Sequence, residues 1–180
     1  TDEEIARDFI LFGQPDVTII VADATHLERN LNLALQVLEI SDRAVVALNL
    51  MDEAKRHGFK VDERQLMRDL GVPVIPMIAR RAIGVPQLLQ AVEQVALGAY
   101  PTRPHRIQQR DAQIERVLAK MVAAINAEFP GLPNARWVAL RLLDGDVSIE
   151  RAVREGTLGN LSRGQAAAPA NDILFVEAAI

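Results

Sequence analysis

Residues 44–52 have the sequence AVVALNLMD, in which five apolar residues run directly into a polar turn. An unbroken apolar run of this length is typical of a strand that is covered on both faces of a sheet. Two similar runs lie on either side of it in the chain, VTIIVA at 17–22 and VPVIP at 72–76. The prolines of the last run favour an irregular strand or one near a sheet edge. The sequence therefore predicts three short strands, buried in the interior.

Segments with helical spacing of apolar residues lie before, between and after these strands. Thr25 and Glu28 form a capping box that predicts the start of one helix, and Asp62 with Gln65 predicts the start of another. The predicted helices run from Thr1 to Gly13, from Thr25 to Leu38, through 53–56, from Asp62 to Gly71, and through 88–95 to Gly98. Because strands and helices alternate, we expect an α/β fold with a parallel sheet and helices on both faces.

The pattern changes after this region. Two prolines in the polar stretch 100–105 predict a linker. Helical spacing then predicts a long helix that stops at 129–131, a second helix over 137–143 and a weaker third over 147–155. The segment 173–180 fits either a short helix or a strand. The expected division is an α/β domain, a linker and an all-α domain, at 1–99, 100–105 and 106–180.

The composition argues against several classes of protein. The formal net charge is −4, whereas nucleic-acid binders usually present a basic face, so we expect no nucleic-acid partner. The chain has no cysteine, and its three histidines are scattered, so we expect no metal site. No apolar stretch approaches the ~20 residues that span a bilayer, and no signal peptide opens the chain. We expect a soluble, cytosolic polypeptide.

The turn that follows the middle strand, from Asn49 to Asp52, has the residue types of a base-recognition site. A carboxylate such as that of Asp52 accepts two parallel hydrogen bonds, from the ring N–H and the exocyclic amino group of guanine. Adenine has no donor at the matching ring position, and a site built for a substrate N–H can reject an analogue lacking it by ~10⁴-fold. Asn49 would brace the loop and reach the outer edge of the base. The alternative is a polar strand-to-helix turn that binds no ligand.

Polar residues also follow the other two predicted strands. Ligands of open parallel sheets bind beyond the carboxyl ends of the strands. Asp23, the turn 49–52 and residues 77–81 all fall at those ends, and their convergence favours a nucleotide site there. Asp23 could line the floor of the pocket or belong to the cap of the following helix, which we expect Thr25 to form.

The loop after the third strand contains Ile78-Ala79-Arg80. In guanine-nucleotide proteins, this loop donates a backbone N–H to the guanine oxygen, which we assign here to Ala79, and the next side chain packs along the base. Arg80 could stack on the base or ribose, or form a solvated pair with Arg81. Met51, in the preceding loop, could cover the base or belong to the core.

Other motifs of a nucleotide hydrolase are missing from the 180 residues. No Gly-x-x-x-x-Gly-Lys-Ser/Thr cradles a phosphate, and no Asp-x-x-Gly is present to bind magnesium and the terminal phosphate. No catalytic residue is identified. Positioning and charge neutralisation of the phosphates carry this kind of catalysis, so the chain by itself is not expected to hydrolyse GTP.

Four stretches together resemble the cytosolic region of the ferrous iron transport protein B family. They are EIARDFI at 4–10, VADATHLERNL at 21–31, VVALNLMDEA at 45–54 and, more weakly, WVALRLLDGD at 137–146. The resemblance covers the first 98 residues closely and continues past the linker. It implies the second half of a Ras-like GTPase domain, without its phosphate-binding first half, followed by a helical domain that in the family favours bound GDP.

The resemblance also implies a function. Asn49 and Asp52 would read guanine, Met51 would flank the base, and Ala79 would contact it through the backbone. The ligand would be GTP or GDP, with magnesium held only through motifs absent from this chain. In the whole protein, a GTPase, these domains precede a membrane-embedded ferrous-iron permease at the cytoplasmic face of the bacterial inner membrane. A homo-oligomer is left open.

Two other hypotheses stay open at this point. One is a non-catalytic interaction module that keeps the Ras-like sheet and docks a protein partner. The other is a soluble ribosome-associated GTPase of related fold, against which the net acidity and the run from Asp23 to Asn30 count. A phosphate-binding motif upstream would distinguish the GTPase from the interaction module.

Overall fold

The computed structural model describes residues 9–11, 15–106, 111–132, 134–158 and 174–177. The chain forms two compact units, which we describe separately. One consists of residues 15–106 together with 173–180, and the other of residues 1–14 together with 107–172. The helix predicted from Thr1 to Gly13 lies outside the described residues except at 9–11, which are helical. Within the described residues, no helix is both long and apolar enough to cross a membrane.

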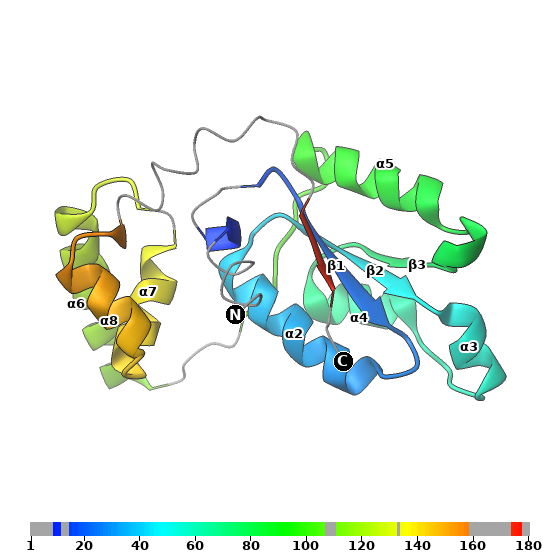
Figure 1. The fold of residues 1–180 in the computed structure, drawn as a ribbon, viewed down its shortest axis with the longest axis horizontal. Helices are drawn as coiled ribbons and strands as arrows, with labels where there is room; N and C mark the ends of the chain where they lie inside the picture. Colours follow the sequence, from blue (N-terminus) through cyan, green and yellow to red (C-terminus); the bar gives the residue numbers. More distant parts are fainter. Residues whose placement is uncertain (1–8, 12–14, 107–110, 133, 159–173, 178–180) are drawn as a thin grey trace. The chain divides into compact units, whose positions relative to one another are not determined.

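A parallel four-stranded sheet forms the centre of the first unit (Figure 1). Its strands are β1 (Thr18–Asp23), β2 (Ala44–Asn49), β3 (Val74–Pro76) and β4 (Leu174–Glu177), in the order β3-β2-β1-β4. The three strands expected from the apolar runs are confirmed. The prediction that the proline-containing strand lies at an edge is also confirmed, because β3 ends the sheet.

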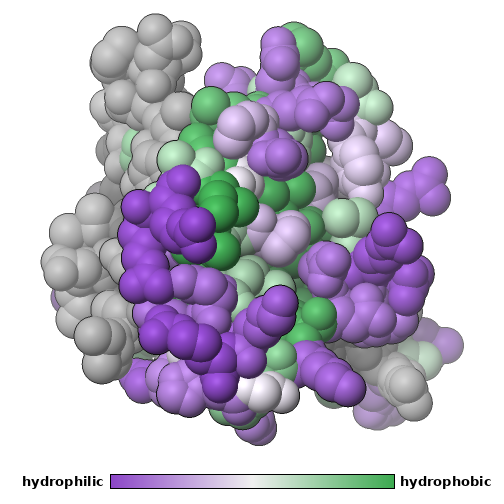
Figure 2. Space-filling model, turned by 90° about the vertical axis from the view of Figure 1, so that its right-hand side faces the viewer, coloured by the Kyte–Doolittle hydropathy of each residue, from purple (hydrophilic) through white to green (hydrophobic). Residues whose placement is uncertain are grey.

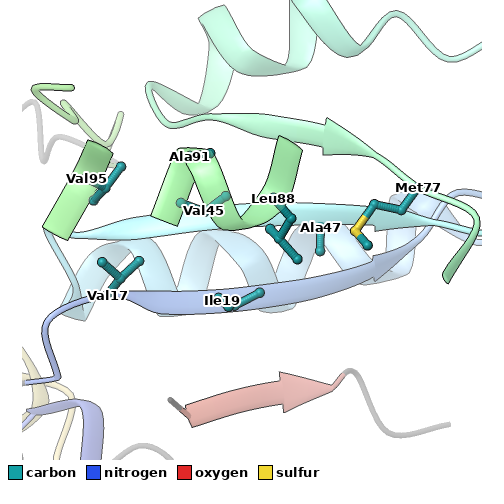
Figure 3. Packing of buried hydrophobic residues seen from close by; sticks show 8 residues of the cluster. All are labelled: Val17, Ile19, Val45, Ala47, Met77, Leu88, Ala91 and Val95. Carbon is teal, nitrogen blue, oxygen red and sulfur yellow. The ribbon is translucent and has the colours of Figure 1, made fainter. Parts of the chain in front are cut away.

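Helices cover both faces of this sheet, as expected. They are α2 (Leu27–Ile40), α4 (Glu63–Leu70) and α5 (Val85–Ala96), while the short α3 (Met51–Arg56) lies beyond the carboxyl end of β2 (Figure 1). On one face, Leu88 and Val95 of α5 pack on side chains of β1 and β2 such as Val45 (Figure 3). The apolar side of α2, with Ala34 and Leu38 fully buried, covers the opposite face (Figure 1). A sheet buried on both sides explains the unbroken apolar runs.

Two predicted helix caps have different outcomes. The side chain of Asp62 accepts a hydrogen bond from the Gln65 N–H at 2.9 Å, which confirms the predicted start of α4. The prediction that Thr25 caps α2 is wrong. The N-cap is His26, without a side-chain bond, and the Thr25 hydroxyl donates to Asp23 Oδ1 at 2.7 Å. Thr25 lies one residue before the N-cap, in the turn after β1, where the bond to Asp23 holds its side chain.

The last strand corrects the expectation that the whole of 106–180 is helical. Leu174–Glu177 pairs in parallel with β1, with Leu174 opposite Thr18 and Glu177 opposite Val21. The segment 173–180 had fitted both a helix and a strand, and the sheet decides between them. Without β4, β1 would present an open edge of unpaired backbone groups, and pairing satisfies them.

The segment expected to be a linker is tied to the first unit by hydrogen bonds. The Arg103 N–H donates to the Gly71 carbonyl at 2.9 Å, and the His105 N–H donates to the Leu70 carbonyl at 3.1 Å. Arg106 pairs with Asp42, with 2.6 Å between Nη2 and Oδ1. Residues 103–106 therefore follow the end of α4 instead of leaving it freely.

Besides the helical residues 9–11, the described part of the second unit contains three helices. They are α6 (Ala112–Glu128), α7 (Ala135–Leu143) and α8 (Val147–Arg154). Trp137 is buried, which confirms its predicted place in the core of this region, together with Leu118 and Ile149. Asp146 caps α8 by accepting from the Ser148 N–H at 3.0 Å.

Candidate functional site

The loops that follow β1, β2 and β3 meet at the carboxyl ends of these strands. The register places Asp23 beside Asn49 and Leu48 beside Pro76, so the three strands end at the same level. The Ala24 N–H donates to the Asn49 carbonyl at 3.0 Å, and the Met51 N–H donates to the Met77 carbonyl at 3.2 Å. The backbone therefore joins the three loops that the sequence predicted to converge. Figure 2 looks onto this end of the molecule and shows hydrophobic groups interspersed with hydrophilic ones.

Asn49 braces the loop after β3. Its Oδ1 accepts a hydrogen bond from the Ala79 N–H at 3.0 Å, across 30 residues of sequence. Since the backbone N–H can only donate, the atom that faces it must be the carboxamide oxygen, which leaves the Asn49 amino group as a donor. This bond is a contact of the bracing kind that was expected of Asn49. It also uses the Ala79 N–H that the sequence had assigned to the guanine oxygen.

Leu50 sets the direction of the chain between the strand and α3. Its φ of 61° and ψ of 30° are left-handed, a conformation that costs roughly 1–2 kcal/mol for a residue with a Cβ. The Leu50 carbonyl accepts from the N–H groups of Glu53 and Ala54 at 3.0 Å, so α3 starts immediately after it. This turn places Met51 and Asp52 in the first turn of α3, directly beyond the end of β2.

One carboxylate oxygen of Asp52 faces the loop after β3, and the other has no hydrogen-bond partner. Its Oδ2 accepts a hydrogen bond from Nη2 of Arg80, while its Oδ1 is buried and has no partner at hydrogen-bond geometry. The hydrogen bond from Arg80, helped by its charge, lowers the pKa of Asp52 although partial burial opposes the shift. Asp52 is therefore an ionised carboxylate at neutral pH. The backbone N–H groups of Asp52 and Glu53 also lower its pKa, but neither reaches Oδ1 at hydrogen-bond geometry, so this oxygen is left as an acceptor for a ligand donor.

Arg80 holds a position that the sequence did not predict. It lies in a short 3₁₀ turn, η1 (Ala79–Arg81), and its Nη1 reaches Glu53 Oε1 at 3.5 Å besides the bond to Asp52. Arg80 and Arg81 are both exposed, and Arg80 in addition pairs with carboxylates, so both predicted roles of Arg80 stay predictions. The backbone N–H of Arg80 donates to no acceptor among the described residues.

Asp23 belongs to the turn after β1. It accepts from the Thr25 N–H at 2.7 Å, from the Thr25 hydroxyl at 2.7 Å, and contacts His26 Nδ1 at 3.1 Å. Burial alone would raise the pKa of Asp23, but the hydrogen bonds from Thr25 and His26 outweigh it and lower the pKa. Its acceptors are thus used locally, which favours the turn over the pocket floor for Asp23.

A cavity of about 690 Å³ lies between the start of α2 and the segment that follows α3. Leu27 and Arg29 of α2 line it, with Phe59 and Val61 on the other side. None of the site residues predicted from the sequence belongs to its lining. Phe59 is 52% exposed, and no motif in the sequence marked it as part of a cavity.

Family models match both parts of the chain. Residues 1–92 match the model of ferrous iron transport protein B, and residues 111–169 match that of the FeoB cytosolic helical domain. The chain belongs to the ferrous iron transport protein B family. Its fold is accordingly part of a Ras-like parallel sheet, without the phosphate-binding first half, combined with a helical domain.

Curated members of the family give the scale of the match. The Fe(2+) transporters FeoB of Salmonella choleraesuis and of Escherichia coli K12 are each 36% identical over 146 residues, which is 81% of this chain. These residues are 18% of each transporter, so the chain spans about a fifth of the length of these relatives.

Solved structures of the family share the fold. The cytosolic domain of Legionella pneumophila FeoB has a TM-score of 0.72 at 31% identity, over 93% of this chain and 68% of that one. The cytosolic domain of Thermotoga maritima FeoB in its GMPPNP form has a TM-score of 0.73 at 28% identity, over 92% and 66%. The same domain in a GDP form has a TM-score of 0.71 at 30% identity, over 92% and 66%.

Proposed function

We propose that this chain reads the guanine base in the GTP- and GDP-binding region of a bacterial ferrous iron transporter, where nucleotide state regulates Fe(II) uptake. One observation carries the proposal. Asp52 is an ionised carboxylate with one buried oxygen that has no hydrogen-bond partner. It lies at the carboxyl ends of the strands, where three loops are joined. Relatives named as Fe(2+) transporters, and relatives solved in GDP and GMPPNP forms, support it and disfavour the alternative of a module that only docks a protein.

Each residue near Asp52 has a role in this proposal. Asp52 accepts from the ring N–H and the amino group of guanine, and Asn49 offers its amino group to the outer edge of the base while it braces the loop. Met51 and Ile78, both half-buried, flank the base. The Ala79 N–H is bound to Asn49, so in this proposal the N–H of Arg80 donates to the guanine oxygen instead. Ala79 then acts by holding the loop.

The rest of the activity belongs to other segments in this proposal. The 180 residues hold no phosphate cradle, so phosphate and magnesium binding, and with them GTP hydrolysis, would need residues outside this chain. The partner of the nucleotide-binding region would be the membrane permease domain of the same polypeptide, which places this region at the cytoplasmic face of the inner membrane. A homo-oligomeric assembly is part of the same hypothesis.

A comparison of three nucleotides tests the base-reading assignment. On the natural full-length gene product, we expect GDP to bind about 10- to 150-fold more tightly than inosine diphosphate, measured by isothermal titration calorimetry. Inosine lacks the exocyclic amino group, so one hydrogen bond to a charged acceptor, worth roughly 1.5–3 kcal/mol, is lost. ADP should bind more weakly still. Equal affinities for GDP and inosine diphosphate would rule out recognition by the Asp52 carboxylate.

A further inference from the structure

The Asp52 carboxylate, which we assign to guanine recognition, already accepts a hydrogen bond from a side chain whose donors resemble those of guanine. Arg80 donates from Nη2 to Asp52 Oδ2, although the two residues are 28 positions apart in the sequence. A guanidinium presents parallel N–H donors in one plane, which is the pattern that a carboxylate accepts in a fork. The guanine edge, with its ring N–H and amino group, presents the same pattern. Arg80 therefore occupies Oδ2, one of the two Asp52 oxygens that guanine needs.

We propose that Arg80 is an internal competitor of the guanine base, whose guanidinium must leave Asp52 before the nucleotide can bind there. The inference rests on the function proposed above and adds a regulatory residue to it. A site that is closed for part of the time binds its ligand more weakly, in proportion to the open fraction. Arg80 thus lowers the affinity for guanine nucleotides and slows their association.

The surroundings of Arg80 allow it to move. Its side chain is 55% exposed, whereas that of Asp52 is 20% exposed, so Arg80 can leave without disturbing the core. Glu53 offers a second place for the guanidinium, since its Oε1 already lies 3.5 Å from Arg80 Nη1. Glu53 also holds Arg56 at 3.1 Å, so its negative charge is shared between two arginines. Arg80 can therefore shift from Asp52 to Glu53 and keep a carboxylate partner.

The backbone N–H of Arg80 has a role in guanine binding that differs from the role of its side chain. Its N–H is the donor that we assign to the guanine oxygen, and it lies in the same 3₁₀ turn as the side chain that blocks Asp52. The bond between Asn49 and Ala79 fixes the start of this turn, so the backbone donor keeps its place while the side chain moves. Binding of the base would then exchange one partner of Asp52 for another without a change in the loop.

Replacement of Arg80 by alanine tests this inference, with Arg81→Ala as the matched control. Both changes remove one positive charge from η1, but Arg81 is part of no ion pair among the described residues. On the full-length gene product, Arg80→Ala is expected to bind GDP about two- to five-fold more tightly, with faster association in stopped flow. That factor corresponds to the worth of an exposed ion pair. Arg81→Ala should leave both quantities unchanged.

Salt provides a second readout, which a purely structural role of Arg80 would not move. The ion pair with Asp52 weakens as ionic strength rises, so the difference in GDP affinity between the wild type and Arg80→Ala should shrink from low to high salt. An affinity that is unchanged or lower in Arg80→Ala would overturn the competition. If the proposed function itself fails, wild type and both variants will instead fail to distinguish GDP from inosine diphosphate. The two failures are therefore separable.

Discussion

Asp52→Asn is expected to convert a site for guanine into a site for xanthine. The side-chain amino group of asparagine donates at a position where a carboxylate oxygen accepts. Two donors, one from the amide and one from guanine, would then face each other. One hydrogen bond to a charged acceptor, worth roughly 1.5–3 kcal/mol, is lost and the other loses its charge, so GDP should bind at least about 10- to 150-fold more weakly. Xanthine carries a carbonyl in place of the amino group and pairs with the amide. Xanthosine diphosphate should therefore bind the variant more tightly than GDP does, by calorimetry.

Asp62→Asn is the matched control for this change. It removes the same charge from the same unit, and asparagine caps a helix as well as aspartate does, so α4 should persist. Asp62 follows α3 and its side chain is bound to the Gln65 N–H, which gives it no role in base recognition. We expect this variant to retain the preference for GDP. Retention of that preference by Asp52→Asn as well would contradict the assignment of Asp52.

Gly71→Ala is expected to lower the free energy of unfolding by roughly 2–5 kcal/mol. Gly71 has a φ of +74°, and a Cβ added there would lie 1.8 Å from the Arg103 carbonyl oxygen. That distance forces the backbone of residues 103–105 away from the end of α4. The hydrogen bonds from Arg103 to Gly71 and from His105 to Leu70 would then be lost, in addition to the strain of a left-handed alanine. Urea denaturation of the chain measures the change.

Gly58→Ala separates the two causes. Gly58 has a φ of +77°, almost the same as that of Gly71, but no atom lies within 4 Å of the position that its Cβ would take. Its replacement should therefore cost only the backbone strain, about 1–2 kcal/mol. The difference between the two variants reports the close contact between Gly71 and Arg103. If the two variants are equally destabilised, residues 103–105 do not pack on α4 as described.

The elements that could be predicted from the sequence are those with a strong local cause. The apolar runs of β1 and β2 have no polar residue to place on a solvent face, which leaves a sheet covered on both sides. Asp62 and Gly71 mark the start and the end of α4 by their own chemistry. The four residues of β4 carry no such signal. Their identity as a strand depends on the edge of β1, more than 150 positions earlier in the chain.

The site shows the same limit. Asn49 and Asp52 could be found from the sequence because the end of a buried strand fixes where they lie. Arg80 could be placed in the correct loop, but its partner depends on a side-chain direction across 28 positions. The role of Ala79 changed for a related reason, since the carboxamide oxygen of Asn49 accepts its N–H. Thr25 does not cap α2 because it lies one residue before the N-cap. Which acceptor a donor binds depends on residues that are close in space but distant in sequence, and the spacing of nearby residues does not reveal it.

A crystal structure of the full-length gene product with GDP would test the central claim most directly. We expect the ring N–H and amino group of guanine to lie about 2.7–3.2 Å from the two carboxylate oxygens of Asp52. We also expect that the Arg80 guanidinium has left Asp52, and that the Arg80 N–H faces the guanine oxygen. A guanine base bound elsewhere, with the ion pair between Asp52 and Arg80 intact, would contradict the account.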